Sequence, residues 1–344
     1  MQFLHQPSAL IARMRALASA LGLAAVAGLA AGPAAAQDSI DMVITNELAT
    51  THWTTGVMED FARRIEERTG GRVTPKVFHA GSLYNDQDAI AALGTGAVHM
   101  VWPVAVRLET IAPEAGVLSL PFAIDDTLMG KEGAPEAVGA YLSKYLEPLG
   151  IRVMGVARTA DLFFLTRKEP IAEMSDLQGM KIRATGGRVL LDLLGKFGAS
   201  SIAMPAPEMG PALAQGAIDG ALTSAGGWEM VGTDVVPYAS LVPGLNMVTY
   251  AIMIDDTWLK SLPDDLRAAI EETTAEFVRS NWPDAKRLDQ ETLDAIVARG
   301  GKLSKVEGAE REAFVEAAQS INETWKEQHP KAWDDFQAAL APFR

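Results

Sequence analysis

Cysteine is absent from this chain of 344 residues, which excludes disulfide bonds, thiol nucleophiles and thiolate metal sites together. Histidine is scarce. Beyond the N-terminal region it occurs four times, and no two share the i, i+4 spacing of a helical metal pair: His52, His79, His99 and His329. Basic residues are also in deficit, 30 against 44 acidic ones, and a net charge of −14 argues against nucleic acid or an anionic membrane surface as a partner.

Long apolar runs are confined to the N-terminus. Two arginines precede the apolar residues 16–31, and Ala34-Ala35-Ala36 supplies the small residues of a cleavage site, a pattern typical of export signals. No other stretch approaches the roughly twenty uninterrupted apolar residues of a membrane span. We therefore predict a signal peptide over residues 1–36, cleaved near Ala36, and a mature chain that starts near Gln37 and does not insert into the membrane.

Strand-like and helical patterns alternate along the rest of the chain. Residues 40–45 alternate as a strand, residues 53–68 carry an apolar residue every four positions as a helix does, and residues 73–78 form the next strand. Further strands are predicted at residues 97–102, 152–156, 180–184, 248–254 and 302–306. Short strands between helices predict an α/β fold with a largely parallel sheet and helices on both faces.

A long helical pattern lies near the C-terminus. We expect Ser261 to cap it, and it continues for about forty residues to Gly300-Gly301. Pro283 removes a backbone donor and should kink or interrupt this helix. A helix of this length is expected to span two domains, the number that the length of the chain also indicates.

The most informative stretch surrounds Arg183. The strand-like residues 180–184 stop at Gly186-Gly187, so Arg183 is predicted at the carboxyl end of a strand, which in open α/β sheets faces the ligand crevice. Its guanidinium is a rigid fork of donors that fits a carboxylate in two parallel hydrogen bonds. We interpret Arg183, with Thr185 in the turn beside it, as binding the acid group of a small ligand; a surface ion pair is the alternative reading of Arg183.

Motifs of catalysis are missing around this stretch. The sequence has no nucleophile elbow, phosphate-binding loop or dinucleotide fingerprint, and Gly226-Gly227 lacks the strand-turn-helix context of a phosphate cradle. These absences favour binding over catalysis and predict neither a cofactor nor a metal. Trp102, Phe163 and Trp228 lie near predicted strand ends or helix starts, where a cleft would be, and we predict that they and His52 line it; core packing is the alternative for the aromatic residues.

Several short motifs occur in the order and spacing of a known family. They are Ala80-Gly81-Ser82-Leu83, Gly96-Ala97-Val98-His99-Met100, Leu120-Pro121-Phe122, residues 176–183, Gln215-Gly216-Ala217-Ile218-Asp219-Gly220 and residues 258–263. Through them the mature chain resembles the solute-binding subunit of tripartite ATP-independent periplasmic (TRAP) transporters of the DctP-like family. The resemblance implies a periplasmic protein with the two-domain periplasmic binding protein fold, hinge strands and a domain-spanning helix. It also implies that Arg183 forms the salt bridge to the ligand carboxylate.

The resemblance further implies domain bounds and a partner. Domain I would comprise residues 37–160 plus about 249–288, and domain II about 161–248 plus 289–344. The protein would capture a small organic acid and deliver it to the TRAP membrane permease subunits. Two other functions stay open from the sequence: presentation of the ligand to a sensor kinase, and a secreted enzyme that acts on an acid substrate.

Departures from the relatives bear on the ligand. Thr223 stands where many relatives carry an asparagine that contacts ligand, and Leu162-Phe163-Phe164 occupies a region where others often have a second polar or basic contact, whereas Asn46 matches a position that often lines the pocket. One strong cation with added apolar surface predicts a monocarboxylate with an apolar or aromatic remainder. A second charge would favour a C4-dicarboxylate or sugar acid instead, and the candidates to supply it are Arg107, Arg158 and Arg188.

Overall fold

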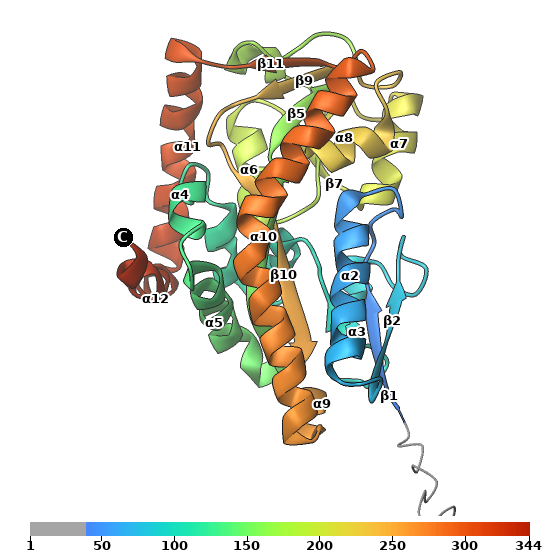
Figure 1. Ribbon diagram of the computed structural model, residues 1–344. Coiled ribbons are helices and arrows are strands. Elements are labelled where there is room, and N and C mark those ends of the chain that lie inside the picture. The colour runs from blue at the N-terminus through green and yellow to red at the C-terminus, as the bar shows by residue number, and fades with distance from the viewer. Residues whose placement is uncertain (1–38) are drawn as a thin grey trace, which may run out of the picture. The chain divides into compact units, whose positions relative to one another are not determined.

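The computed structural model describes residues 39–344, so the predicted signal peptide and its cleavage site near Ala36 lie outside the described residues. These residues form two mixed β-sheets with helices packed around them (Figure 1). The α/β class predicted from the sequence is confirmed. The expectation of largely parallel sheets is wrong, because each sheet contains antiparallel pairs.

The first sheet has the strand order β2-β1-β3-β10-β4. In it β1 pairs in parallel with β2 and β3, whereas β10 runs antiparallel to its neighbours β3 and β4. Its strands are β1 (Ile40–Thr45), β2 (Val73–Phe78), β3 (Met100–Val101), β4 (Ile151–Asp161) and β10 (Met247–Asp255). The strand predicted at residues 97–102 is reduced to two residues, since Val98 makes only an isolated bridge to Leu93.

The second sheet has the order β11-β9-β5-β8-β6-β7. Here β6 pairs in parallel with β7 and β8, while β5 runs antiparallel to β8 and β9. Its strands are β5 (Phe163–Thr166), β6 (Lys181–Ala184), β7 (Ser200–Ala203), β8 (Gly220–Thr223), β9 (Tyr238–Leu241) and β11 (Lys302–Lys305).

The antiparallel strands carry the chain between the sheets. From β4 the chain crosses through Leu162 into β5, and from β9 it returns through residues 242–246 into β10. The chain runs from the first sheet to the second along β4 and β5, and it runs back along β9 and β10. The outgoing and returning strands therefore pair antiparallel, β4 with β10 and β5 with β9. At the crossing, Leu162 N donates to Asn246 O at 3.0 Å. Direct crossings without an intervening helix explain the mixed sheets.

Sixteen helical segments accompany the strands of residues 39–344. The α-helices are α2 (Trp53–Arg68), α3 (Asp86–Ala92), α4 (Asp126–Met129), α5 (Ala134–Leu146), α6 (Arg188–Lys196), α7 (Ala206–Gln215), α8 (Ala225–Val231), α9 (Asp256–Ser261), α10 (Asp264–Ala298), α11 (Gly308–Gln328) and α12 (Pro330–Leu340). The 3₁₀ helices are η1 (Ala105–Thr110), η2 (Pro113–Ser119), η3 (Glu147–Leu149), η4 (Met174–Leu177) and η5 (Ala341–Phe343). Among the helices of residues 39–344, none combines the length and the apolar run that a membrane crossing requires.

Helix α10 runs unbroken for 35 residues with Pro283 inside it, so the predicted interruption is wrong. Trp282 is buried, and its Nε1 donates to Asp126 Oδ1 at 2.9 Å; this tertiary packing offsets the backbone bond that proline removes. The predicted cap is also wrong, because Ser261 ends α9 and Pro263 precedes α10. The helix packs against β4, α2 and α5 and also against α8, which connects the surroundings of both sheets (Figure 1).

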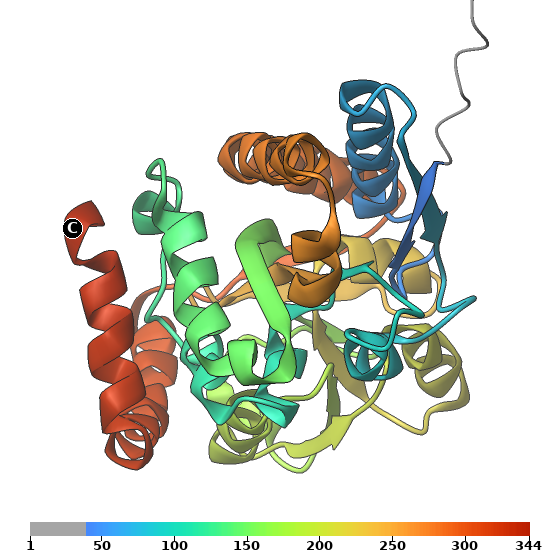
Figure 2. The ribbon, with the colours of Figure 1, turned by 90° about the horizontal axis from the view of Figure 1, so that it is seen from below.

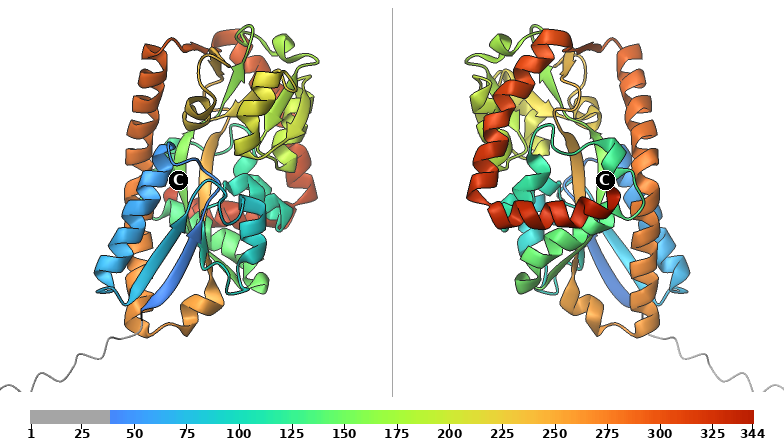
Figure 3. Two further views of the ribbon diagram at one scale, coloured as in Figure 1. Left: turned by 90° about the vertical axis from the view of Figure 1, so that its right-hand side faces the viewer. Right: turned by 90° about the vertical axis from the view of Figure 1, so that its left-hand side faces the viewer.

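The C-terminal helix α12 returns to α5, the helix that packs on β4 of the first sheet. It lies along α5 (Figures 2 and 3), where Phe336 contacts Tyr141 with the ring centroids 5.4 Å apart. The predicted domain bounds put these C-terminal residues with the second domain. Because residues 40–344 form one compact unit, the bounds of the two domains remain a prediction.

Candidate functional site

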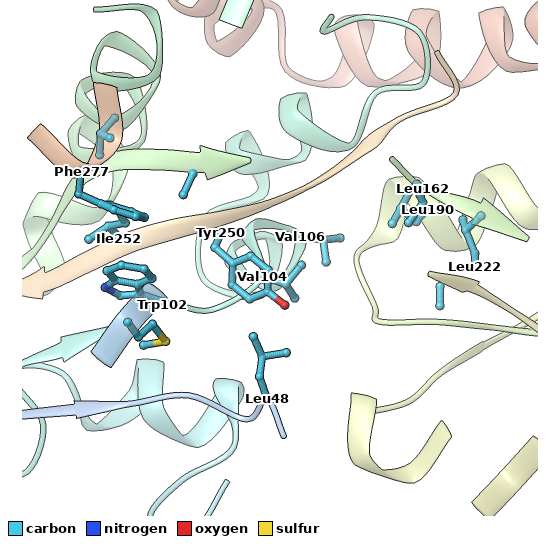
Figure 4. Close-up of a cluster of buried hydrophobic side chains, with 14 of the residues drawn as sticks. Leu48, Trp102, Val104, Val106, Leu162, Leu190, Leu222, Tyr250, Ile252 and Phe277 are labelled. Atoms are coloured by element: carbon cyan, nitrogen blue, oxygen red, sulfur yellow. The ribbon is translucent and has the colours of Figure 1, made fainter. Parts of the chain in front are cut away.

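One cavity is lined by segments of both sheets and holds about 70 Å³, several times the roughly 15 Å³ that a single water needs. Its larger apolar lining residues are Leu48, Val104, Val106, Leu118, Leu162, Leu190, Leu222, Met230 and Val248. Its main polar lining residues are Glu47, His52, Ser119, Arg183, Thr185, Thr223, Ser224, Asn246 and Tyr250. Figure 4 shows two apolar groups, with Tyr250, Val104 and Leu48 on one side and Leu162, Leu190 and Leu222 on the other.

Arg183 is the cation of this cavity. It is the third of the four residues of β6, as predicted, and only 1% of its surface is exposed. Its Nε and Nη2 donate to Met204 O at 3.0 and 2.7 Å, and among residues 39–344 no carboxylate lies within ion-pair distance of it. Burial lowers the pKa of Arg183 to about 10, against the opposing effect of nearby Glu47, so the guanidinium is charged at neutral pH. A ligand carboxylate would supply the missing counter-charge.

The turn after Arg183 is held by the 3₁₀ helix η1. Gly187 has φ +82°, and a Cβ built on it would lie 2.1 Å from Cγ2 of Val106 in η1. Glu109, also in η1, accepts hydrogen bonds at Oε2 from the backbone N of Arg188 and Val189, at 2.6 and 3.3 Å. Helix α6 has no side-chain cap of its own, so Glu109 satisfies its first amide donors. The glycine pair is therefore required both for its backbone conformation and for close contact with η1.

Gly187→Ala is expected to lower the free energy of unfolding by about 2–4 kcal/mol, because it adds backbone strain and a steric overlap with Val106. Urea denaturation followed by circular dichroism measures the change. Gly195→Ala in α6 is the matched control: a Cβ there meets nothing within 4 Å, and alanine should stabilise the helix slightly. Equal stability of the two variants would contradict the packing described.

Two buried acids, Glu47 and Asp86, lie next to each other near the cavity wall, and the sequence analysis singled out neither. Glu47 lines the cavity and accepts from Asp86 N at 3.2 Å and from Ala206 N at 3.4 Å. Asp86 Oδ2 accepts from Val104 N at 3.1 Å. Burial, and then the charge of Glu47, raise the pKa of Asp86 well above its usual range. The one sequence signal for Glu47 is its place directly after Asn46 at the end of β1.

His52 enters the cavity wall at the start of α2. Its Nδ1 accepts from Thr54 N at 3.2 Å, which makes it the N-cap, and its ring packs on Gly226, where a Cβ would lie 2.1 Å from Nε2. Burial lowers the pKa of His52 to about 4. The imidazole is therefore neutral at pH 7 and offers the cavity a hydrogen-bonding group without charge.

Lowering the pH should destabilise the protein through His52. The folded ring titrates near pH 4 and the unfolded one near 6.5, so the unfolded chain binds more protons in between. The free energy of unfolding should thus fall by about 3 kcal/mol as the pH drops through this interval. His52→Asn keeps an N-cap acceptor and should lack this loss. The free energy of unfolding of the wild type and of His52→Asn is measured by urea denaturation at pH 7 and at pH 4. Burial raises the pKa of Asp289 to about 6, but Asp289 is present in both proteins, so its contribution cancels in the comparison. Parallel profiles would refute the assignment.

Four predicted site residues come together in the cavity wall: Arg183, Thr185, Thr223 and His52. The predicted Asn46 does not. It is buried behind the wall, where Nδ2 lies 2.7 Å from His79 Nδ1 and Oδ1 accepts from Leu48 N at 2.9 Å. Asn46 thus shapes the end of β1 and presents its neighbours Glu47 and Leu48 to the cavity.

The three predicted aromatic residues lie in the core instead of the cavity wall. Trp102 packs against Phe61 and Phe277, with centroid distances of 5.1 and 4.8 Å; Figure 4 shows Trp102 beside Phe277. Phe163 meets Trp228 edge to face at 6.1 Å, and Trp228 Nε1 donates to Val236 O. A position near a strand end does not decide which way a side chain faces, because successive strand side chains point to opposite sides.

Gly226-Gly227 lies in helix α8, which follows strand β8 with only Ser224 between them, so the pair does stand between a strand and a helix, contrary to the expectation from the sequence. Ser224 caps this helix by accepting from Gly227 N at 3.2 Å. The glycines provide room for neighbouring side chains: Gly226 for the His52 ring, and Gly227 for Thr223, whose Oγ1 would lie 2.2 Å from a Cβ. The pair therefore shapes the cavity wall.

Two of the three arginines considered for a second charge are engaged elsewhere. Arg158 is buried and ion-paired with Asp126 at 2.7 Å, Asp161 at 2.6 Å and Asp289 at 3.7 Å. Arg188 is 84% exposed and pairs with an aspartate of its own helix. Neither lines the cavity.

Arg107 differs from both. It is buried in η1 next to the lining residues Val104 and Val106, and its Nε has no hydrogen-bond partner among residues 39–344. Its Nη1 would lie 3.3 Å from a Cβ on Gly186, in the turn after Arg183. Of the three arginines considered for a second charge, Arg107 is therefore the one that lies nearest to the site, although it does not itself line the cavity. Residues 39–344 contain no cluster of three or more histidine or acidic side chains arranged to hold a metal ion.

Comparison with known proteins identifies similar chains. The family described as "Bacterial extracellular solute-binding protein, family 7" matches residues 44–328. A solute-binding protein of Chromohalobacter salexigens is 27% identical over 281 residues, which cover 80% of this chain and 81% of that protein.

Solved structures show the same fold. The sugar acid binding protein of Advenella mimigardefordensis in complex with galactonate aligns with a TM-score of 0.82 at 21% identity, over 89% of this chain and 99% of that one. A TRAP periplasmic solute-binding protein of Shewanella oneidensis with bound succinate aligns with a TM-score of 0.80 at 24% identity, over 89% and 100%. These likenesses confirm the expected two-domain periplasmic binding protein fold.

Proposed function

The chain belongs to bacterial extracellular solute-binding protein family 7, whose members are transport proteins rather than enzymes, and from this premise we propose what it binds. We propose that it captures a small organic acid in the periplasm, holds the carboxylate with Arg183 and passes the acid to a TRAP membrane permease. An N-terminal signal over residues 1–36 would direct its export.

The observation that carries the proposal is the buried guanidinium of Arg183. Burying a cation without a paired anion costs free energy. Arg183 is such a cation: it lines a cavity, and its only hydrogen-bond acceptor among residues 39–344 is the carbonyl oxygen of Met204. A carboxylate bound there would gain charge-assisted hydrogen bonds and neutralise the cation.

Binding would favour a closed arrangement of two domains. The proposed domains, residues 37–160 plus about 249–288 and about 161–248 plus 289–344, each contribute lining residues to the cavity. The crossing strands and α10 would act as the hinge. A ligand that contacts Arg183 from one domain and Tyr250 from the other stabilises the closed state by its greater affinity for it.

For the ligand we favour a monocarboxylate with an apolar or aromatic remainder. Three leucines, Leu162, Leu190 and Leu222, line the same cavity as Arg183, and Thr223 adds only a small polar group to its wall. Arg158 and Arg188 are engaged elsewhere. The alternative is a C4-dicarboxylate or sugar acid. Unpartnered Arg107 favours it, as do the galactonate and succinate bound by the two solved structures.

A thermal-shift screen of the exported protein against aliphatic and aromatic monocarboxylates, 2-oxoacids, dicarboxylates and sugar acids tests the proposal. A ligand at about a hundred times its Kd should stabilise the fold by about 2.7 kcal/mol. Hits among monocarboxylates alone would support the favoured class, and hits on dicarboxylates or sugar acids would support the alternative. A complete absence of hits among organic acids would refute the proposed function.

A further inference from the structure

The cavity wall carries one cation and one anion that do not pair with each other. Arg183 and Glu47 both line the cavity and both are buried. The charge of Glu47 acts on Arg183, which places the two within electrostatic reach. Nevertheless, they form no ion pair within 4 Å in residues 39–344.

Backbone groups hold the two charges apart. Arg183 is anchored through Nε and Nη2 to the carbonyl of Met204, and Glu47 through its two carboxylate oxygens to the amides of Ala206 and Asp86. Opposite charges in a poorly solvated interior attract each other strongly and would pair if they were free to move. Their separation is therefore built into the fold and leaves space for a molecule that binds both.

We propose that Glu47 determines specificity by accepting a hydrogen bond from a hydroxyl or ammonium group of the ligand while Arg183 binds its carboxylate. This inference rests on the proposed function and narrows it: the ligand is a hydroxy acid or an amino acid rather than an unsubstituted acid. A carboxylate at Glu47 accepts hydrogen bonds only, so it selects for a donor and disfavours a ligand that places an oxo or second carboxylate group there.

The neighbours of Glu47 fit this assignment. Burial, and then the charge of Glu47, raise the pKa of Asp86, which disfavours a second negative charge at this end of the cavity. Tyr250 on β10 lines the cavity and directs its hydroxyl toward Leu48 and Val104 (Figure 4). Burial raises the pKa of Tyr250 well above its usual value, so this hydroxyl remains a neutral group that donates or accepts. The ligand's polar substituent would thus meet one charged acceptor and one neutral partner.

Matched ligands test the proposal on the unmodified protein. The series consists of 4-methylpentanoate and its 2-hydroxy, 3-hydroxy, 2-amino and 2-oxo derivatives, with succinate and malate as a second pair, each titrated by calorimetry. At least one ligand with a donor should bind roughly tenfold to a hundredfold tighter than its unsubstituted parent, and the 2-oxo derivative should gain nothing. Preference for the hydroxy or the amino derivative identifies which donor Glu47 accepts. Equal affinity across the series would overturn the inference.

A variant then assigns the preference to Glu47. Glu47→Gln keeps the shape but loses the charge, and it should reduce the preference for the donor-bearing acid at least severalfold while the parent acid still binds. Glu66→Gln, an exposed position of α2, serves as the control and should change nothing. An unchanged preference in folded Glu47→Gln, verified by circular dichroism, would overturn the inference. If the variant does not fold, the wild-type series decides alone.

The same titrations separate this inference from the proposed function. If Arg183→Ala abolishes binding but donor-bearing and parent acids bind the wild type equally, the organic-acid function stands and only the role of Glu47 fails. If no acid of either series or of the wider screen binds the wild type, both fail.

Discussion

Arg183→Ala should weaken binding of the tightest organic acid by about 2–5 kcal/mol, a loss of roughly thirtyfold to several thousandfold in Kd. The variant removes the counter-charge of a carboxylate that would be buried with it in the cavity, and no other arginine lines the wall within residues 39–344. Isothermal titration calorimetry measures the change. Arg183→Lys should recover only part of the affinity, because one ammonium cannot reproduce both the bond to Met204 and a two-point contact with the ligand.

The matched control is Arg188→Ala. Arg188 is exposed and follows Arg183 by five residues, so its loss removes the same side chain from the same neighbourhood without touching the cavity. It should bind ligand as the wild type does. Near-native affinity in folded Arg183→Ala would show that the acid group binds elsewhere.

The largest expected effect on stability belongs to Arg158. Arg158→Met should lower the free energy of unfolding by about 3–5 kcal/mol, because it leaves Asp289 and, in part, Asp126 and Asp161 without their cation at the crossing between the sheets. Methionine approximates the volume of the arginine stem, so the change reports mainly on charge and hydrogen bonding. Chemical denaturation at neutral pH measures it.

Arg287→Met on α10 is the control for this experiment. Arg287 pairs with Glu291 on the exposed face of the helix, where ion pairs contribute little. Its stability should stay close to that of the wild type. A loss at Arg158 no larger than that at Arg287 would mean that the three aspartates are solvated well enough without the arginine.

Local patterns predicted the elements well. The strand at residues 40–45, the helix at 53–68 and the strand at 73–78 agree residue for residue with β1, α2 and β2. Apolar periodicity acts over a few residues and the glycine pair after Arg183 acts on its own backbone, so these features are legible without knowledge of the fold. The family was likewise recognisable from short motifs, and the comparison confirms it.

Tertiary contacts overrode local rules at other places. Pro283 has the sequence signal of a helix interruption, but the packing of Trp282 keeps α10 continuous. Ser261 has the signal of a cap, yet it ends the preceding helix. The local preference of a residue for or against a helix is worth a few kcal/mol or less, and the free energy gained by burying a large side chain can exceed it.

By itself, the sequence determined the order of strands and helices, the family and the placement of Arg183 at a strand end, because each depends on residues close together in the chain. The fold alone decided what faces Arg183. Glu47 is brought to the same cavity from a distant segment, whereas Trp102, Phe163 and Trp228 turn into the core. Strand alternation reveals that neighbouring side chains face opposite ways, but only the packing of the two sheets settles which side becomes the cavity.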